Sequence, residues 1–200
     1  QKQALQFEKL PQNLAQTLQV PRVSAAICYD KHRDVVYMHG GYKDSNCSDF
    51  LEYSFITNTW KLIEAKTPLG ACSYHCATYL PPPFDSVLIV PSRQQQLADM
   101  KSARILKLWL YHLPTKTWSF TTLKEFLKQG EAIKKLASWD AVMQVHYDER
   151  TQVLYLVTTK EWFCIRVPAC TQLVTKTFQT NMFQAAINKW TTNLVINYTS

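Results

Sequence analysis

One short stretch of the chain combines residue types that can bind a metal ion. It reads Cys72-Ser-Tyr-His75-Cys76, with a histidine between two cysteines. Thiolates and imidazoles are the usual ligands of zinc in proteins. If residues 73–80 form a strand, however, Cys72 and Cys76 lie about 13 Å apart. Because zinc ligands lie only about 2.0–2.3 Å from the ion, we expect no metal ion or other cofactor here and interpret the cysteines as buried free thiols.

Familiar catalytic motifs are missing from the sequence. It contains no Gly-x-Ser-x-Gly nucleophile elbow, no phosphate-binding glycine loop and no His-Glu-x-x-His pair. The five histidines are isolated, and only His75 lies between cysteines. We therefore expect that the protein is not an enzyme.

Cysteine content and composition bear on the compartment. The six cysteines are Cys28, Cys47, Cys72, Cys76, Cys164 and Cys170. With 200 residues, 46% of them hydrophobic, the chain is too large and apolar to need a disulfide scaffold. The two glycosylation sequons, at Asn46 and Asn197, are about what chance gives, and the first ten residues lack the apolar core of a signal peptide. We expect reduced cysteines and a cytoplasmic or nuclear protein, with a secreted protein as the alternative.

The charge balance is basic, with 22 Lys and Arg against 15 Asp and Glu and a net charge of +7. Such a balance favours acidic partners, which include nucleic acids and acidic proteins. The basic residues are scattered and form no basic tail, so we expect a protein partner with an acidic patch. A basic subunit associated with nucleic acid is the alternative. No apolar run approaches the roughly 20 residues of a membrane helix, so we expect no membrane span.

Internal repeats organise the chain. Four hairpin-like units, each an apolar strand, a polar turn and a second apolar strand, occupy residues 23–41, 73–91, 141–159 and 182–200. The first three are followed by further strands that end in Thr-Asn-Thr-Trp60, Thr-Lys-Thr-Trp118 and Thr-Lys-Thr-Phe178. With Phe7 in an earlier copy, these aromatic residues are 53, 58 and 60 residues apart. This period predicts an all-β fold of four-stranded antiparallel sheets, as in the blades of a propeller.

The first complete unit carries a recognisable set of residues. Arg22 precedes its first strand, Gly40 and Gly41 end the second, Tyr53 follows, and Trp60 lies near the fourth. In these residues the unit resembles the kelch repeat. Half of the chain's four glycines lie in this one pair, which predicts a positive φ or a close backbone approach there. We also expect Trp60 and its counterpart in the next unit to be equivalent buried anchors between blades.

The resemblance to kelch repeats implies a kelch-like β-propeller segment that forms a single region over residues 1–200. It places blades at about 20–64, 70–122 and 139–180, the last strand of an earlier blade at about 1–12, and a partial blade at about 181–200. The later units lack the glycine pair, so the array is degenerate, and another all-β fold built of hairpins is the alternative. About three and a half blades form half a ring, which a second chain or a parent-chain segment would complete; closure as a very small ring is the other possibility.

The same resemblance implies a function. Propellers of this kind present variable loops on rigid blades, so we expect a non-catalytic protein–protein interaction module that serves as a scaffold or adaptor. Some kelch-like propellers are copper oxidases, but no residues here match the metal ligands of those enzymes. A kelch-like oxidase without recognisable ligands is therefore only an alternative.

Two insertions predict where a partner binds. Residues 91–104 and 121–138 interrupt the regular unit length and leave the middle blade on the same side. Apolar residues in the second insertion recur close to helical spacing, which predicts a short helical insertion near 121–138. The predicted partner-binding residues are Arg93, Lys101, Arg104, Lys124, Phe126, Lys128, Lys134 and Lys135. In the alternative interpretation, the segment caps the propeller and its lysines are merely solvated.

Overall fold

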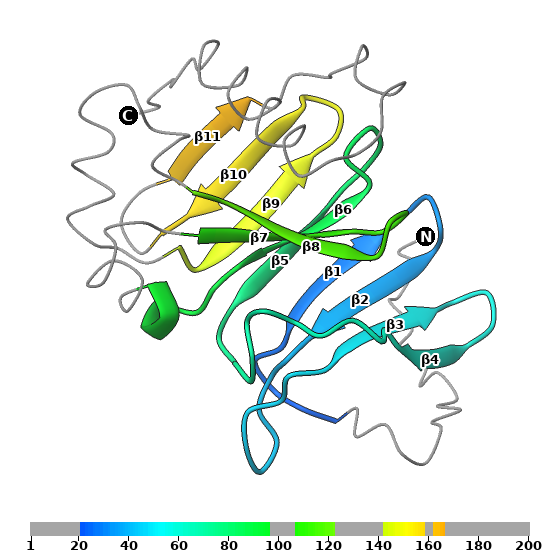
Figure 1. Cartoon of the computed structure of the whole chain (residues 1–200). Coiled ribbons are helices and arrows are strands. Elements are labelled where there is room, and N and C mark those ends of the chain that lie inside the picture. Colours follow the sequence, from blue (N-terminus) through cyan, green and yellow to red (C-terminus); the bar gives the residue numbers. More distant parts are fainter. Residues whose placement is uncertain (1–20, 97–106, 123–141, 159–161, 167–200) are drawn as a thin grey trace, which may run out of the picture.

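The computed structural model of the chain describes residues 21–96, 107–122, 142–158 and 162–166. Within these ranges the regular secondary structure is almost entirely β-strand, and one short helical segment at residues 93–96 follows the sixth strand (Figure 1). Residues 26–30 alternate buried and exposed side chains, as expected for a half-buried strand, whereas residues 86–90 are buried throughout, as expected for a strand packed on both faces. The predicted all-β class with four-stranded antiparallel sheets is confirmed. Among the described residues, no helix is long and apolar enough to cross a membrane.

Three antiparallel sheets follow one another along the chain, and in each sheet sequential strands pair. The first sheet consists of β1 (Ala26–Asp30), β2 (Val35–His39), β3 (Phe50–Ser54) and β4 (Thr59–Leu62). The second consists of β5 (Cys76–Leu80), β6 (Ser86–Val90), β7 (Lys107–His112) and β8 (Thr117–Thr122). The described part of the third consists of β9 (Gln144–Asp148), β10 (Val153–Val157) and β11 (Trp162–Arg166).

The first strands of successive sheets lie beside one another. Strand β1 packs against β5, and β5 packs against β9 (Figure 1). A hydrophobic core fills the space between the first and second sheets, with Phe50 of β3 edge-on to Tyr111 of β7 at 5.1 Å between ring centroids. The molecule is therefore a series of sheets stacked face to face in chain order.

The repeated Thr-x-Thr-Trp motif has the same structure in both complete sheets. The tryptophan is the second residue of the last strand, where Trp60 pairs with Tyr53 and Trp118 pairs with Tyr111. In both turns the residue between the two threonines has a positive φ, and the threonine hydroxyls bond each other at 2.8 Å and 2.7 Å. The sequence repeat is thus also a structural repeat. Both tryptophans are half-buried rather than fully buried.

The observed sheets can be compared with the predicted blade boundaries. The first two sheets fall within the predicted ranges 20–64 and 70–122, and the third falls within 139–180. The predicted strand at 1–12 and the partial blade at 181–200 lie outside the described residues. The predicted helical insertion also lies outside them, except that residues 121 and 122 are the end of β8.

Candidate functional site

The glycine pair at the end of β2 allows a distant segment to approach the first sheet. Gly40 and Gly41 have φ values of +59° and +101°. A Cβ on Gly40 would lie 2.5 Å from the carbonyl oxygen of Cys72 and 2.9 Å from Cε1 of His75. The backbone N–H of Gly41 donates to that same carbonyl at 2.8 Å. Both predicted needs, positive φ and close approach, are therefore present, and together they bring residues 72–75 against the end of β2.

This approach gathers two histidines and a cysteine into one buried group. Nδ1 of His39, the last residue of β2, lies 2.8 Å from Nε2 of His75. The sulfur of Cys72 lies 3.9 Å from the first nitrogen and 3.8 Å from the second. We call His39, Cys72 and His75 the Cys/His cluster. All three side chains are buried, and these ligand atoms lie within 4.8 Å of one another.

The strand boundary assumed from the sequence is wrong at this point. Strand β5 begins at Cys76 rather than at residue 73, and Tyr74 has a φ of +56°. The chain turns between Cys72 and Cys76, so the extended spacing used against a zinc site does not apply there. Cys72 meets His39, which is 33 residues away, rather than Cys76. The short sequence motif contained two of the three residues, but nothing in it pointed to the third.

Burial sets the protonation state of the Cys/His cluster. It lowers the pKa of His39 to about 3, and the neighbouring His75 lowers it further. Burial also lowers the pKa of His75 to about 4, although the nearby carbonyls of His39 and Ser73 act in the opposite direction. The pKa of the Cys72 thiol is raised to about 11 by burial. At neutral pH, both imidazoles are therefore neutral and the free thiol is protonated.

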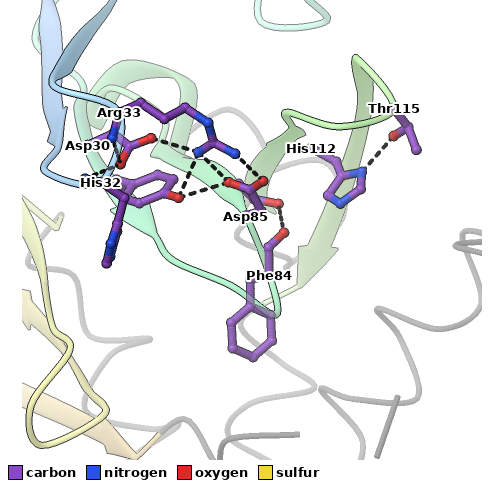
Figure 2. Close-up of polar contacts among 9 residues, drawn as sticks. Asp30, His32, Arg33, Phe84, Asp85, His112 and Thr115 are labelled. Atoms are coloured by element: carbon purple, nitrogen blue, oxygen red, sulfur yellow. Dashed lines mark hydrogen bonds and ion pairs between the residues drawn. The ribbon is translucent and has the colours of Figure 1, made fainter. Parts of the chain in front are cut away.

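A second polar site links the first sheet to the second. Arg33, in the turn between β1 and β2, donates to both carboxylate oxygens of Asp85, at 2.7 Å and 2.5 Å (Figure 2). It also donates to Asp30 at 2.7 Å and to the hydroxyl of Tyr79 at 3.0 Å. That hydroxyl donates in turn to Asp85 at 2.8 Å. Figure 2 shows His112 of β7 near this group, with its Nδ1 paired to Thr115.

The pKa values of this second site reflect its ion pair. Burial alone would raise the pKa of Asp85, but the hydrogen bonds from Arg33 and Tyr79 outweigh it and lower that pKa below its usual value. The bond to Asp85 is the main cause of the raised pKa of Arg33. The ion pair is charged at neutral pH and fixes the first sheet against the second.

The first sheet has its own copy of the tyrosine–aspartate pair. Tyr29 is the penultimate residue of β1, as Tyr79 is of β5, and its hydroxyl donates to Asp34 at 2.7 Å. Asp34 directly precedes β2, as Asp85 precedes β6, and both aspartates have a positive φ. Tyr79 is 7% exposed, whereas Tyr29 is 51% exposed. Among the described residues, no arginine bridges Tyr29 and Asp34.

Exposed apolar side chains surround Tyr29. Ile27 precedes it on the same face of β1, and Phe55 lies edge-on to its ring at 6.0 Å. Val23 and Tyr42 pair with each other in continuation of the β1–β2 register. We call these five exposed residues, Val23, Ile27, Tyr29, Tyr42 and Phe55, the β1 patch. Several exposed apolar side chains along one strand pair are typical of an interaction site.

Of the predicted partner-binding residues, only Arg93 lies in the described part of the chain. It is exposed at the start of the helical segment 93–96. The remaining seven lie outside the described residues: Lys101, Arg104, Lys124, Phe126, Lys128, Lys134 and Lys135. That basic surface therefore stays a prediction. The β1 patch was missed because its residues read from sequence as ordinary strand positions.

Comparisons with known proteins assign no family to the chain. No protein-family model matches it, and no curated protein matches it. Among solved structures it is similar to the structure of YjhT, with a TM-score of 0.40 and 11% sequence identity. That similarity covers 76% of this chain and 53% of the other, so the chain spans about half the length of that protein.

Proposed function

We propose that the chain is a non-catalytic protein-interaction module, a kelch-like propeller segment whose first sheet docks a further β-sheet at the β1 patch. The observation that carries this proposal is the exposed Tyr29–Asp34 pair. Its counterpart, Tyr79–Asp85, is covered by the preceding sheet in the stack. In this proposal a partner protein supplies the docked sheet, so the module acts as a scaffold or adaptor.

The two complete sheets have equivalent outer faces, each on the side where a preceding sheet would pack. Paired residues of antiparallel strands share a face of the sheet. On the first sheet this outer face carries Ile27, Tyr29, Val36, Met38, Leu51, Tyr53, Trp60 and Leu62. On the second sheet the corresponding face carries Ala77, Tyr79, Val87, Ile89, Trp109, Tyr111, Trp118 and Phe120. Both are wholly apolar or aromatic.

The first sheet covers the second of these faces. Members of that face, including Val87, Ile89 and Tyr111, belong to the core shared by the two sheets. The face of the first sheet remains exposed at its β1 end, where Ile27 is 56% exposed. Burying apolar surface favours association by about 25 cal/mol per Å² before the entropic cost of binding is subtracted. Met38, Leu51 and Tyr53 of this face are already buried, so a docking sheet would gain its apolar contact at the β1 end, from Ile27 and Tyr29.

The chemistry of the partner follows from the Arg33 bridge. Arg33 reaches Tyr79 and Asp85 from the first turn of the sheet that covers them. Tyr29 and Asp34 offer the same hydroxyl and carboxylate in the same relative positions. The partner is thus a β-sheet that carries an arginine in the turn between its first two strands. A charge-assisted, bidentate contact of this kind fixes orientation as well as adding affinity.

Site-specific photo-crosslinking in cells tests this proposal. A photoreactive residue is placed at position 27 in the β1 patch, and the crosslinked peptide is sequenced by mass spectrometry. The expected product joins position 27 to a β-sheet segment with an arginine in its first turn. Asp34→Asn should lower the yield at least fivefold because it removes the charge that the arginine would pair with.

The control position is Met143, an exposed apolar residue that precedes β9 of the third sheet. A photoreactive group at 143 should not give this product. The proposal fails if position 27 crosslinks no more than position 143 does, or if its product forms equally well with Asn at position 34.

A further inference from the structure

The Cys/His cluster plays no part in the proposed docking. It lies at the end of β2, where residues 63–75 lead from the first sheet to the second. We propose that His39, Cys72 and His75 bind one zinc ion, which fastens this linker to the first sheet.

The positions of the three ligand atoms fit a zinc ion with little movement. An ion at about 2.0–2.1 Å from each nitrogen and about 2.3 Å from the sulfur would set tetrahedral ligands about 3.3–3.6 Å apart. The observed separations are 2.8 Å between the nitrogens and 3.8–3.9 Å between each nitrogen and the sulfur. Binding therefore requires shifts of only about half an ångström or less, within the range of side-chain adjustment.

Hydrogen bonds around the cluster orient the ring of His39 for metal binding. Its Nε2, the nitrogen that faces away from the cluster, pairs with the hydroxyl of Thr67 at 2.9 Å. Metal-bound histidines usually donate their second ring N–H to such an oxygen, which fixes the tautomer. With Nε2 protonated, the lone pair of Nδ1 points toward Cys72 and His75.

The donor set selects the kind of ion. One sulfur and two imidazole nitrogens favour zinc over magnesium, calcium or manganese, which prefer oxygen ligands. On binding, the Cys72 thiol releases its proton to solvent and the thiolate binds the ion. The described residues supply three ligands, so the fourth position is left for a water molecule.

The backbone is shaped to hold these ligands together. Gly40 follows His39 directly, and any Cβ there would collide with the carbonyl of Cys72 and the ring of His75. The N–H of Cys72 donates to the carbonyl of Cys47 at 3.0 Å, which anchors the linker from the other side. Cys72 is thus held by backbone hydrogen bonds to the loop that follows the strand carrying His39.

Cobalt(II), used as a spectroscopic substitute for zinc, tests the proposal. The full chain is freed of metal with a chelator and titrated with cobalt. We expect one equivalent to bind and to give a thiolate-to-cobalt charge-transfer band, which zinc then removes. Cys72→Ser should abolish the band, and His75→Gln should weaken cobalt binding at least tenfold.

Cys76→Ser is the matched control, because Cys76 lies four residues away but outside the cluster. Its charge-transfer band should equal that of the wild type. The wild-type titration alone can overturn the proposal: no charge-transfer band, or binding without saturation at one equivalent, rules out the site. A band that survives Cys72→Ser, or disappears with Cys76→Ser, assigns the metal elsewhere.

Discussion

At the scale of single residues, backbone geometry around Gly40 decides how the linker meets the first sheet. We predict that Gly40→Ala lowers the free energy of unfolding by about 2–4 kcal/mol. About 1 kcal/mol comes from the positive φ, and the remainder comes from displacing the backbone of Cys72. Gly70 is the matched control, since it has a φ of +65° but nothing within 4 Å of an added Cβ. Gly70→Ala should cost only about 1 kcal/mol, and equal losses in urea unfolding would contradict the close-approach account.

The Arg33–Asp85 ion pair gives a second prediction at this scale. Asp85→Asn should lower the free energy of unfolding by about 1–3 kcal/mol at pH 7. The lower end is expected because the Arg33 side chain is 42% exposed and solvent screens the pair. Asp34→Asn, the equivalent change without an arginine partner, should cost less than half as much. If both variants unfold at the same urea concentration, the bridge does not stabilise the stacked sheets.

The same ion pair should make this difference depend on pH. The pKa of Asp85 is lowered in the folded protein, so its carboxylate stabilises the fold above the unfolded pKa of about 3.9. That contribution is lost as the pH falls through the folded value. The difference in unfolding free energy between wild type and Asp85→Asn should therefore narrow from pH 5 to pH 3. A difference that widens over this range would reverse the sign of the linkage.

At the scale of elements, the two tryptophans occupy equivalent positions in unequal surroundings. Trp118 packs against Phe50, His39 and Tyr111 in the core between the sheets. Trp60 lies on the outer face of the first sheet and contacts Tyr53. We predict that Trp118→Ala costs about 3 kcal/mol and that Trp60→Ala costs at least about 1 kcal/mol less. Thermal unfolding of the isolated chain measures both, and a larger loss for Trp60 would contradict the assigned packing.

The sequence predicts features that depend on neighbouring residues better than features that join residues far apart in the chain. The sheets were predictable because alternation within strands and the Thr-x-Thr-Trp turns act over a few residues. The Cys/His cluster was not predictable, because it joins His39 to residues more than 30 positions away. Its geometry also depends on the strand beginning at Cys76 and not at residue 73. A shift of three residues in one strand boundary thus changed the interpretation of the site.

The Tyr29–Asp34 pair was hidden for a different reason. Its residues fall within the predicted first hairpin. Only the contacts of Arg33 with Tyr79 and Asp85 of the second sheet show that such a pair binds an arginine. The comparison needs the register of two sheets, which places Tyr29 and Tyr79 at the same position. In a chain of repeated units each unit contacts its neighbour in an equivalent way, so the covered face of the second sheet indicates what the exposed face of the first sheet could bind.

At the scale of the whole molecule, the outer face of the first sheet carries exposed apolar side chains at β1, where we propose that a partner docks. Stability and assembly should therefore be linked, since a ligand that binds only the folded state stabilises it. The partner sheet should cover Ile27 and Tyr29 while the third sheet stays as accessible as before.

Hydroxyl-radical footprinting of the isolated complex, compared with the chain alone, shows whether the partner covers the β1 patch. Tyr29 is 51% exposed in the β1 patch, and Tyr74 is 77% exposed in the linker before β5. Because both are tyrosines, their oxidation rates can be compared directly. Docking at the β1 patch should lower the oxidation rate of Tyr29 at least fivefold in the complex and leave that of Tyr74 unchanged. An unchanged rate at Tyr29 in a complex that remains intact would contradict docking at the β1 patch.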